Sequence, residues 1–219
     1  SSDLFITEAA AEKDRHLTHI EDAVLEGGVN GTRNAIEFLR SLRDMFADDG
    51  TTLSEARGGL ILRTKFDGAP AIYAGINPEN GKFFVGSKSI FAKNAKLNYT
   101  EADIRANHSG GLAEKLSQAL KYLPELGIKG IVHGDFMFSK SDLKSETIDG
   151  KKYITFRPNT ITYAVQEGTP VAAQVRAAQI GIVFHTTYTG QTMQTLSTHF
   201  DIDITALRKS KNEIGRAHV

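Results

Sequence analysis

The sequence predicts an α+β fold with mainly antiparallel sheets and flanking helices, and three observations support this prediction. Residues 7–46 have helical composition, and the later part of this segment has apolar side chains at helical spacing. Most of the remaining chain consists of short β-type runs separated by turn residues. One long amphipathic helix, over residues 112–123, interrupts these strands. We therefore expect an N-terminal helical pair in residues 1–50, packed on a core that residues 51–219 form.

Composition and charge restrict the possible functions. The chain has 26 basic and 26 acidic residues, which argues against wholesale coating of nucleic acid but allows a local basic cleft. No run approaches the ~18 consecutive apolar residues of a membrane span. The first residues lack the basic and apolar regions of a secretory signal. Cysteine is absent, which excludes disulfides and cysteine-ligated zinc. We therefore expect a cytoplasmic protein without a membrane partner.

The N-terminal segment predicts two helices. The first covers residues 7–25, where three consecutive alanines favour helix, and it ends at Gly28. The second ends at Asp48-Asp49-Gly50. His16 and His19 would lie on one face of the first helix, as a metal site requires. Because no third ligand has suitable spacing, we favour a packed or surface face over a metal site.

The core is predicted from short apolar runs. The expected strands cover residues 60–66, 71–76, 82–87, 128–132 with an exit at 133–138, 153–156, 160–165 and 179–185. The expected helices cover residues 112–123, 171–178 and 193–200. Residues 140–152 are polar and turn-like. Lysines gather around Phe91 in residues 88–96, as either a solvated loop or a surface that contacts phosphate.

The most informative stretch covers residues 62–72, which we interpret as a strand, a tight turn and a second strand. Asp67-Gly68 is a strong signal for a two-residue hairpin turn. Lys65 stands directly before this turn among small and apolar neighbours. Its amine can there lose solvation, lower its pKa and become a nucleophile. The alternative is a solvated lysine beside a hairpin.

The run Lys65-Phe66-Asp67-Gly68 has the form Lys-x-Asp-Gly. It resembles the first motif of the covalent nucleotidyltransferases, which include ATP-dependent DNA ligases, RNA ligases and mRNA-capping enzymes. Later segments follow in the order of that superfamily. Val85-Gly86-Ser87-Lys88-Ser89 resembles its Ser-Arg-type motif, and Val132-His133-Gly134-Asp135-Phe136 resembles its apolar-Gly-Glu-Leu strand.

Three further segments extend the resemblance. Residues 154–156 are similar to the segment whose aromatic ring stacks on the base, and residues 181–183 to the Glu-Gly-apolar-Val strand along the phosphates. Residues 208–211 stand near the place of the last, lysine-rich motif. Nearly the whole chain also resembles uncharacterised proteins of tailed bacteriophages that share an Asp-Gly-Ala-Pro-Ala core.

The resemblance implies an ATP-grasp-like adenylation domain of the ligase type. Unlike DNA ligases, the chain shows no recognisable OB-fold domain after the last strand. The likeness to phage proteins implies the cytoplasm of an infected host cell. The ligase resemblance implies that Lys65 attacks the α-phosphate of ATP, holds AMP covalently and passes it to the 5′-phosphate end of a nucleic acid, with Mg²⁺ neutralising charge. It implies nucleotide-binding roles for Thr64, Phe66, Asp67, Gly68, Ser87, Lys88, Asp135, Phe156 and Ile182. Among these, Lys88 would contact phosphate or ribose, Asp135 the ribose hydroxyls and Phe156 the base.

The chain departs from the family pattern at three places. Ala69-Pro70-Ala71 replaces the arginine that follows the first motif in DNA ligases, and Lys88 replaces an arginine but lacks its two-pronged guanidinium. Ile180 stands where the fourth motif has a metal-binding glutamate, so the sequence locates no metal ligands. We interpret His185 as a buried structural histidine, with a contribution to metal binding as the alternative.

Two other functions are compatible with the same residues. A ligase-like fold without catalysis could bind nucleic acid or assemble with other phage proteins, as the loss at Ile180 suggests, although Lys65 argues against it. His133-Gly134-Asp135 also resembles the catalytic loop of kinases of the aminoglycoside phosphotransferase type, with Asp135 as base. Lys140 then stands where such kinases have asparagine. Asp135 could equally be a turn residue that backbone amides satisfy.

Overall fold

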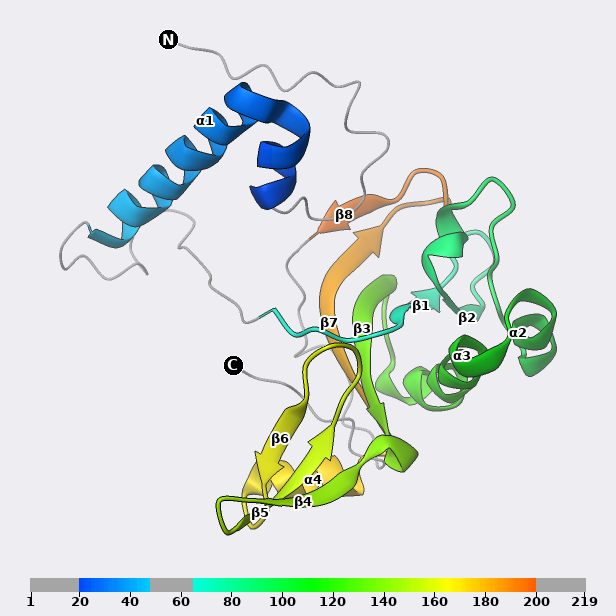
Figure 1. The fold of residues 1–219 in the computed structure, drawn as a ribbon. Coiled ribbons are helices and arrows are strands. Elements are labelled where there is room, and N and C mark those ends of the chain that lie inside the picture. Colours follow the sequence, from blue (N-terminus) through cyan, green and yellow to red (C-terminus); the bar gives the residue numbers. More distant parts are fainter. Residues whose placement is uncertain (1–19, 48–64, 200–219) are drawn as a thin grey trace. The chain divides into compact units, whose positions relative to one another are not determined.

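The computed structural model describes residues 20–47 and 65–199, which belong to two units, Ser1–Arg63 and Thr64–Val219 (Figure 1). The division between the units falls after residue 63, later along the chain than the boundary at residue 50 that the sequence suggests. Thr64, most of the strand expected over residues 60–66, His16, His19 and the basic run 208–211 lie outside the described residues.

The first unit contributes one kinked helix, α1 (Ile20–Ala47). At Gly28 the backbone leaves the helical region, with φ 53° and ψ −133°, so two helical segments meet there. Glycine accepts this positive φ because it has no Cβ. The break expected at Gly28 is therefore confirmed.

The second unit is built around a five-stranded antiparallel sheet in the order β2-β1-β3-β7-β8. Its strands are β1 (Ala71–Ile76), β2 (Phe83–Gly86), β3 (Ile131–Ser139), β7 (Ile180–Thr189) and β8 (Ser197–His199). Each neighbouring pair is antiparallel, which confirms the expected α+β class with antiparallel sheets. β3 is the central strand and pairs with β1 on one side and β7 on the other.

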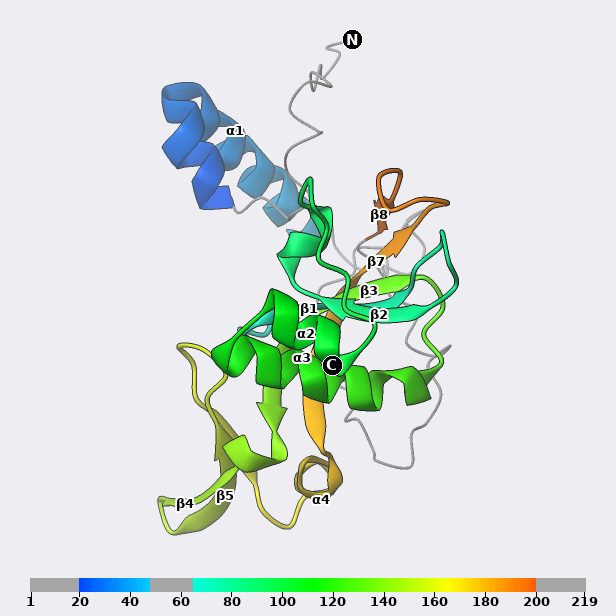
Figure 2. The ribbon, with the colours of Figure 1, turned by 90° about the vertical axis from the view of Figure 1, so that its right-hand side faces the viewer.

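Helices cover one face of this sheet. In Figure 2, α2 (Glu101–Asn107) and α3 (Gly110–Tyr122) lie just below β1, β2 and β3. The core on this face contains Ile72, Val85, Leu116, Leu123, Val132, Phe136 and Ile182, and η3 (Leu123–Leu126) extends it. Side chains alternate between the faces of a strand, so the residues next to these in β1 and β3 point to the opposite face. There a second cluster contains Tyr73, Phe84, Ile131 and Tyr188, with Ile90 from η2 (Lys88–Phe91).

A second, three-stranded antiparallel sheet has the order β4-β5-β6. It consists of β4 (Lys144–Ile148), β5 (Lys151–Phe156) and β6 (Tyr163–Gln166), and α4 (Pro170–Ala177) packs against it. The end of β3 contributes Met137 and Phe138 to this core. β3 thus supplies side chains to the cores of both sheets.

The predictions for two segments are wrong. Residues 140–152 are not simply turn-like, because they contain η4 (Lys140–Asp142), all of β4 and the start of β5. β4 is exposed along its whole length, so it has no apolar alternation for sequence analysis to detect. The helix expected over residues 193–200 is replaced by a turn and β8, and Met193 and Leu196 are buried as parts of that turn. Within the described residues no helix has the length and apolar character needed to cross a bilayer.

Candidate functional site

The Lys-x-Asp-Gly segment meets β3 at its last residue, Gly68, and at the two residues that follow it. Just before β1, the Ala69 amide donates to the Phe136 carbonyl over 3.1 Å, and the Phe136 amide donates to the Pro70 carbonyl over 3.0 Å. The Ala69–Pro70 peptide bond is cis. These bonds prolong the β1–β3 alignment, in which Ala71 stands opposite Asp135. The described part of the segment is therefore irregular and attached to β3, and the expected two-residue hairpin turn is not formed.

Gly68 allows a close approach to β3. A Cβ at this position would lie 2.7 Å from the Cβ of Asp135 and 2.8 Å from the Sδ of Met137. Real Cβ atoms essentially never come so close to other heavy atoms. The lack of a side chain at Gly68 is therefore what allows the motif to lie directly against Asp135.

Asp67 attaches the motif to the loop between β5 and β6. Its carboxylate accepts hydrogen bonds from Asn159 Nδ2 at 2.9 Å and from Thr160 Oγ1 at 2.7 Å. Its backbone amide donates to the Tyr163 hydroxyl at 2.7 Å. The bond from Asn159, followed by that from Thr160, lowers the pKa of Asp67. These bonds attach the motif to the loop between β5 and β6, and the nucleotide contact that the resemblance implies for Asp67 stays a prediction.

Lys65 and Asp135 are electrostatically coupled. The Asp135 side chain is 20% exposed, and its burial raises the pKa to about 6, against the opposing positive charge of Lys65. The charge of Lys65 also contributes to the lowered pKa of Asp67. Lys65 itself is exposed, so the expectation of a desolvated amine is wrong. The amine nevertheless acts on the acid that the resemblance assigns to the nucleotide.

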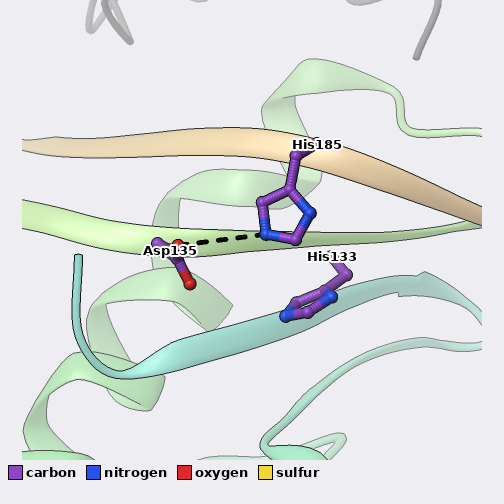
Figure 3. Close-up of side chains that lie close together, drawn as sticks. All are labelled: His133, Asp135 and His185. Atoms are coloured by element: carbon purple, nitrogen blue, oxygen red, sulfur yellow. Dashed lines mark ion pairs between the residues drawn. The ribbon is translucent and has the colours of Figure 1, made fainter. Parts of the chain in front are cut away.

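Asp135 belongs to a cluster with His133 and His185 (Figure 3). One potential ligand atom from each residue lies within 4.8 Å of the others. His185 Nε2 is 3.9 Å from Asp135 Oδ2, the contact drawn as a dashed line in Figure 3. The rings of His133 and His185 have centroids 4.4 Å apart and meet at 69°. Two imidazoles and a carboxylate therefore converge on the sheet face opposite α3.

Strand geometry explains this convergence. His133 and Asp135 are two residues apart on β3, so their side chains share a face. In β7, Phe184 stands opposite Gly134 and Thr186 opposite His133, which leaves His185 as the extra residue of a β-bulge. A bulge can re-aim a side chain, and here His185 points toward the other two. A Cβ at Gly134 would lie only 2.4 Å from a carbonyl oxygen of β7, so glycine is required beside the bulge.

Sequence reasoning misses part of this cluster. It gives His133 only a place within a motif, although the spacing from Asp135 is enough to predict a shared face. It interprets His185 as buried and structural, but this side chain is 38% exposed. The bulge that turns His185 inward leaves no signal in the residue pattern. Asp135 lies within β3, so the interpretation of Asp135 as a turn residue is wrong.

Ser87 and Lys88 lie at the same end of the sheet as Asp135. Gly86, the last residue of β2, stands opposite Tyr73, and the start of β1 two residues earlier stands opposite Asp135. Ser87 caps η2, and its hydroxyl lies 2.9 Å from that of Ser89, whereas Lys88 is exposed. Both predicted residues therefore remain candidates for contact with a ligand at this end.

Three other predicted residues have packing roles. Phe156 is 8% exposed and lies near Phe138 and Tyr163, with ring centroids at 4.8 and 5.5 Å. Because neighbouring side chains already cover it, Phe156 does not offer an open ring face to a base. Ile182 is 5% exposed in the core beneath α3, on the opposite face from Asp135. Phe66 is half-buried near Tyr163, at 5.9 Å between ring centroids.

Comparisons with known proteins add a family but no activity. A family model described as a family of unknown function (DUF6267) matches residues 14–216. No curated protein matches the chain. No solved structure matches it. The function must therefore be argued from the residues themselves.

Proposed function

We propose that this chain, which belongs to the DUF6267 family of unknown function, is a covalent nucleotidyltransferase. It would form a lysyl-AMP intermediate at Lys65. One observation carries this proposal: the Lys-x-Asp-Gly segment lies against β3 beside Asp135. The candidate nucleophile and the candidate ribose-binding acid come from distant parts of the sequence. Gly68, three residues after Lys65, packs against Asp135, and the charge of Lys65 acts on this acid. Both observations support a shared site in an adenylation domain of the ligase type.

The proposed first step is the attack of the Lys65 amine on ATP. Lys65 gives up its ammonium proton to solvent, and the neutral amine attacks the α-phosphorus of ATP. A nitrogen–phosphorus bond forms, the bond from the α-phosphorus to the bridging oxygen breaks, and pyrophosphate leaves. A second amine proton also passes to solvent, which leaves a phosphoramidate. Because Lys65 is exposed, its amine is accessible to a nucleotide from solution.

In the proposed second step, AMP passes to the 5′-phosphate of a nucleic acid. The phosphate oxygen attacks the α-phosphorus, and the lysine amine leaves after it takes a proton from solvent. Lys88, exposed at the same end of the sheet as Asp135, is the candidate contact for a phosphate. A divalent cation, Mg²⁺ by the resemblance, would neutralise charge that develops on the phosphates.

Covalent labelling tests this proposal. The protein is incubated with α-labelled ATP or GTP and Mg²⁺ or Mn²⁺, and then denatured. We expect label that survives denaturation but is released by acid, as a phosphoramidate requires. Lys65→Ala should abolish it. Lys151→Ala, which removes an exposed lysine from the second sheet, should retain it. Absence of label with every nucleotide, or equal label in Lys65→Ala, would refute the proposal.

A second candidate is a ligase-like protein that binds nucleic acid without catalysis. Two observations favour it: Lys65 is exposed, and Ile180 is fully buried where the resembled family has a metal-binding acid. This candidate predicts no covalent label but direct binding of 5′-phosphorylated oligonucleotides. The kinase alternative is not proposed, because His133-Gly134-Asp135 lies inside β3 and not in a loop.

A further inference from the structure

The three side chains of the cluster form a set of ligands that suits a metal ion. Neutral imidazole nitrogens and a carboxylate oxygen are common ligands of zinc and of other divalent transition metals. Four-coordinate ions with bonds of about 2.0–2.1 Å need ligand atoms roughly 3.4 Å apart. The ligand atoms lie within 4.8 Å of one another, and the His185–Asp135 pair is already at 3.9 Å. Small side-chain rotations would therefore complete the geometry.

We propose that His133, Asp135 and His185 bind a divalent transition-metal ion, with Zn²⁺ as the representative ion, through two nitrogens and one oxygen. This inference rests on the proposed function and deepens it, since it names the metal class that would act beside Lys65. Mg²⁺ prefers six oxygen ligands in octahedral geometry, which this set does not supply. Imidazole instead suits Zn²⁺, Co²⁺ and their neighbours in the first transition row.

Neighbouring groups orient both histidines. His185 Nδ1 lies 2.7 Å from the Thr186 hydroxyl, which directs Nε2 toward Asp135. The ring of His133 stacks on Tyr73, with centroids 4.1 Å apart and planes at 9°. Such outer contacts fix ring orientation at metal sites. Each imidazole is thus held in place by a neighbour outside the cluster.

Three protein ligands leave one position of a tetrahedral ion open. His185 is 38% exposed and Asp135 is 20% exposed, so the cluster is accessible from solution on their side, whereas His133 is buried. The charge of Lys65 acts on Asp135. Gly68, three residues after Lys65, packs against Asp135, so a phosphate oxygen bound at the open position would lie near the segment that carries the proposed nucleophile. The ion would take a charge-neutralising role even though Ile180 provides no acid.

Direct metal titration tests this site without using nucleotide. The parent protein carries His16→Ala and His19→Ala. These changes remove the other pair of histidines, which the sequence predicts on one face of a helix and which could bind metal. After chelator treatment, Zn²⁺ binding is followed by calorimetry, and Co²⁺ binding by visible absorption. We expect a single Zn²⁺ equivalent and the strong Co²⁺ bands typical of tetrahedral coordination. Mg²⁺ at the same concentration should bind much more weakly.

Matched variants localise the ion. His185→Ala should weaken Zn²⁺ binding by at least about tenfold, as expected for the loss of a ligand. His199→Ala, which removes an exposed histidine at β8, should bind as the parent does. Circular dichroism and metal-free melting of each variant verify that it is folded. Asp135→Asn gives an independent loss if His185→Ala fails to fold.

The outcomes separate this inference from the proposed activity. Lys65→Ala should lose the covalent label and still bind Zn²⁺ at least as tightly as the parent, because it removes a positive charge that acts on Asp135. Absence of Zn²⁺ binding, unchanged affinity in both folded ligand variants, or a preference for Mg²⁺ would overturn the metal site. Metal binding without any covalent label would refute the nucleotidyltransferase and leave the metal site standing.

Discussion

Asp135 is a carboxyl group whose position is unfavourable for stability. Its folded-state pKa is about 6, above the ordinary value of 3.8, and burial is the main cause. Above about pH 6 the carboxylate is ionised in both states, so the folded state bears the full cost of its poor solvation. Below about pH 4 both states are protonated and this cost disappears. A mostly buried acid of this kind, beside two histidines and under the influence of a lysine charge, is typical of a functional site.

Replacing this carboxyl should therefore stabilise the metal-free protein. Asp135→Asn is expected to raise the free energy of unfolding by about 1–2 kcal/mol at about pH 8, a value reduced for the remaining exposure of the side chain. The gain should shrink between about pH 6 and pH 4 and vanish below that range. Urea unfolding of chelator-treated protein at several pH values measures it. A gain that persists well below the ordinary pKa of the carboxyl would contradict the proposed cause.

Asp67 provides a contrast within the same segment. Hydrogen bonds from Asn159 and Thr160 lower its pKa, so its ionised form is favoured in the folded state. The stability that this carboxylate contributes is present above its unfolded pKa and is lost as the pH falls through its folded pKa. Asp67→Asn should therefore destabilise the protein in mildly alkaline buffer, in the opposite direction to Asp135→Asn, in the same urea titrations.

Gly68 should tolerate no side chain. Gly68→Ala would place a Cβ 2.7 Å from Asp135 Cβ and 3.0 Å from the Phe136 carbonyl oxygen, so the motif must move away from β3. We expect a loss of about 1–3 kcal/mol in stability, as for other overpacked positions, together with reduced covalent label. Gly111→Ala is the control, because nothing lies within 4 Å of its Cβ and alanine favours helix α3. Equal melting temperatures for the two variants would contradict this prediction.

At the level of elements, the sequence predicts strands best where burial is one-sided or complete. The strand expected over residues 71–76 is β1, and the helix expected over residues 112–123 differs from α3 only at its ends. β4 is not predicted because all of its residues are exposed. β8 is not predicted because Met193 and Leu196, just before it, have the spacing of apolar residues in a helix. These last two residues are buried by the fold and not by a local helical face.

At the site, too, the local sequence predicts less than the pairing of the strands determines. The order of the motifs predicts that Lys88 and Asp135 belong to one site, and the strand register places both at one end of one sheet. The motif order predicts a nucleotide contact for Ile182, but this side chain lies on the opposite face of the sheet from Asp135. A shift of one residue in a strand is enough to move a side chain to the other face. It also fails to bring in His185, because the bulge between β3 and β7 depends on their pairing and not on either sequence alone. Which face a residue occupies is thus decided by partners that are distant in sequence.

The stability that the contact between the end of β3 and α3 contributes should depend on pH. Lys115 of α3 pairs with Asp142 of η4, and Asp142 also accepts a hydrogen bond from Ser139 Oγ at 2.6 Å. Burial acts to raise the pKa of Asp142, but the bonds from Lys115 and Ser139 outweigh it and lower the pKa. The stability this group contributes is present above its unfolded pKa of about 3.8 and is lost as the pH falls through the folded value.

Asp142→Asn should consequently destabilise the protein near neutral pH, because it leaves the mostly buried Lys115 ammonium without its partner charge. The Asp142 side chain is 40% exposed, so solvent screens the pair. We therefore expect a loss of only about 1 kcal/mol. Well below the ordinary pKa of the carboxyl, the two proteins should unfold at more similar urea concentrations.

Glu146→Gln, which removes an exposed carboxyl from β4, serves as the control for Asp142→Asn and should leave stability unchanged in neutral and in acidic buffer. A loss in Asp142→Asn that is the same in both buffers would show that packing, and not charge, is responsible.

For the molecule as a whole, net charge offers little attraction for a polyanion, because the formal net charge is zero. Any binding of nucleic acid must then depend on a local group of cations. In the part of the chain that the structure describes, Lys88 and Lys93 are exposed in or just after η2, which follows the end of β2. The surface formed by residues 88–96 is therefore the candidate contact for phosphates.

This distribution of charge leads to a prediction about salt. Binding of a 5′-phosphorylated oligonucleotide should weaken as salt rises, because cations released from the phosphates drive association. Lys93→Ala should lower affinity at low salt and reduce the slope of log K against log salt by about one, the effect of one lost phosphate contact. Fluorescence anisotropy over a series of salt concentrations measures both quantities. Lys151→Ala, in the second sheet, makes the same change in net charge and should leave the slope unaltered. If the two variants weaken binding equally, the attraction is general and the surface formed by residues 88–96 has no special role.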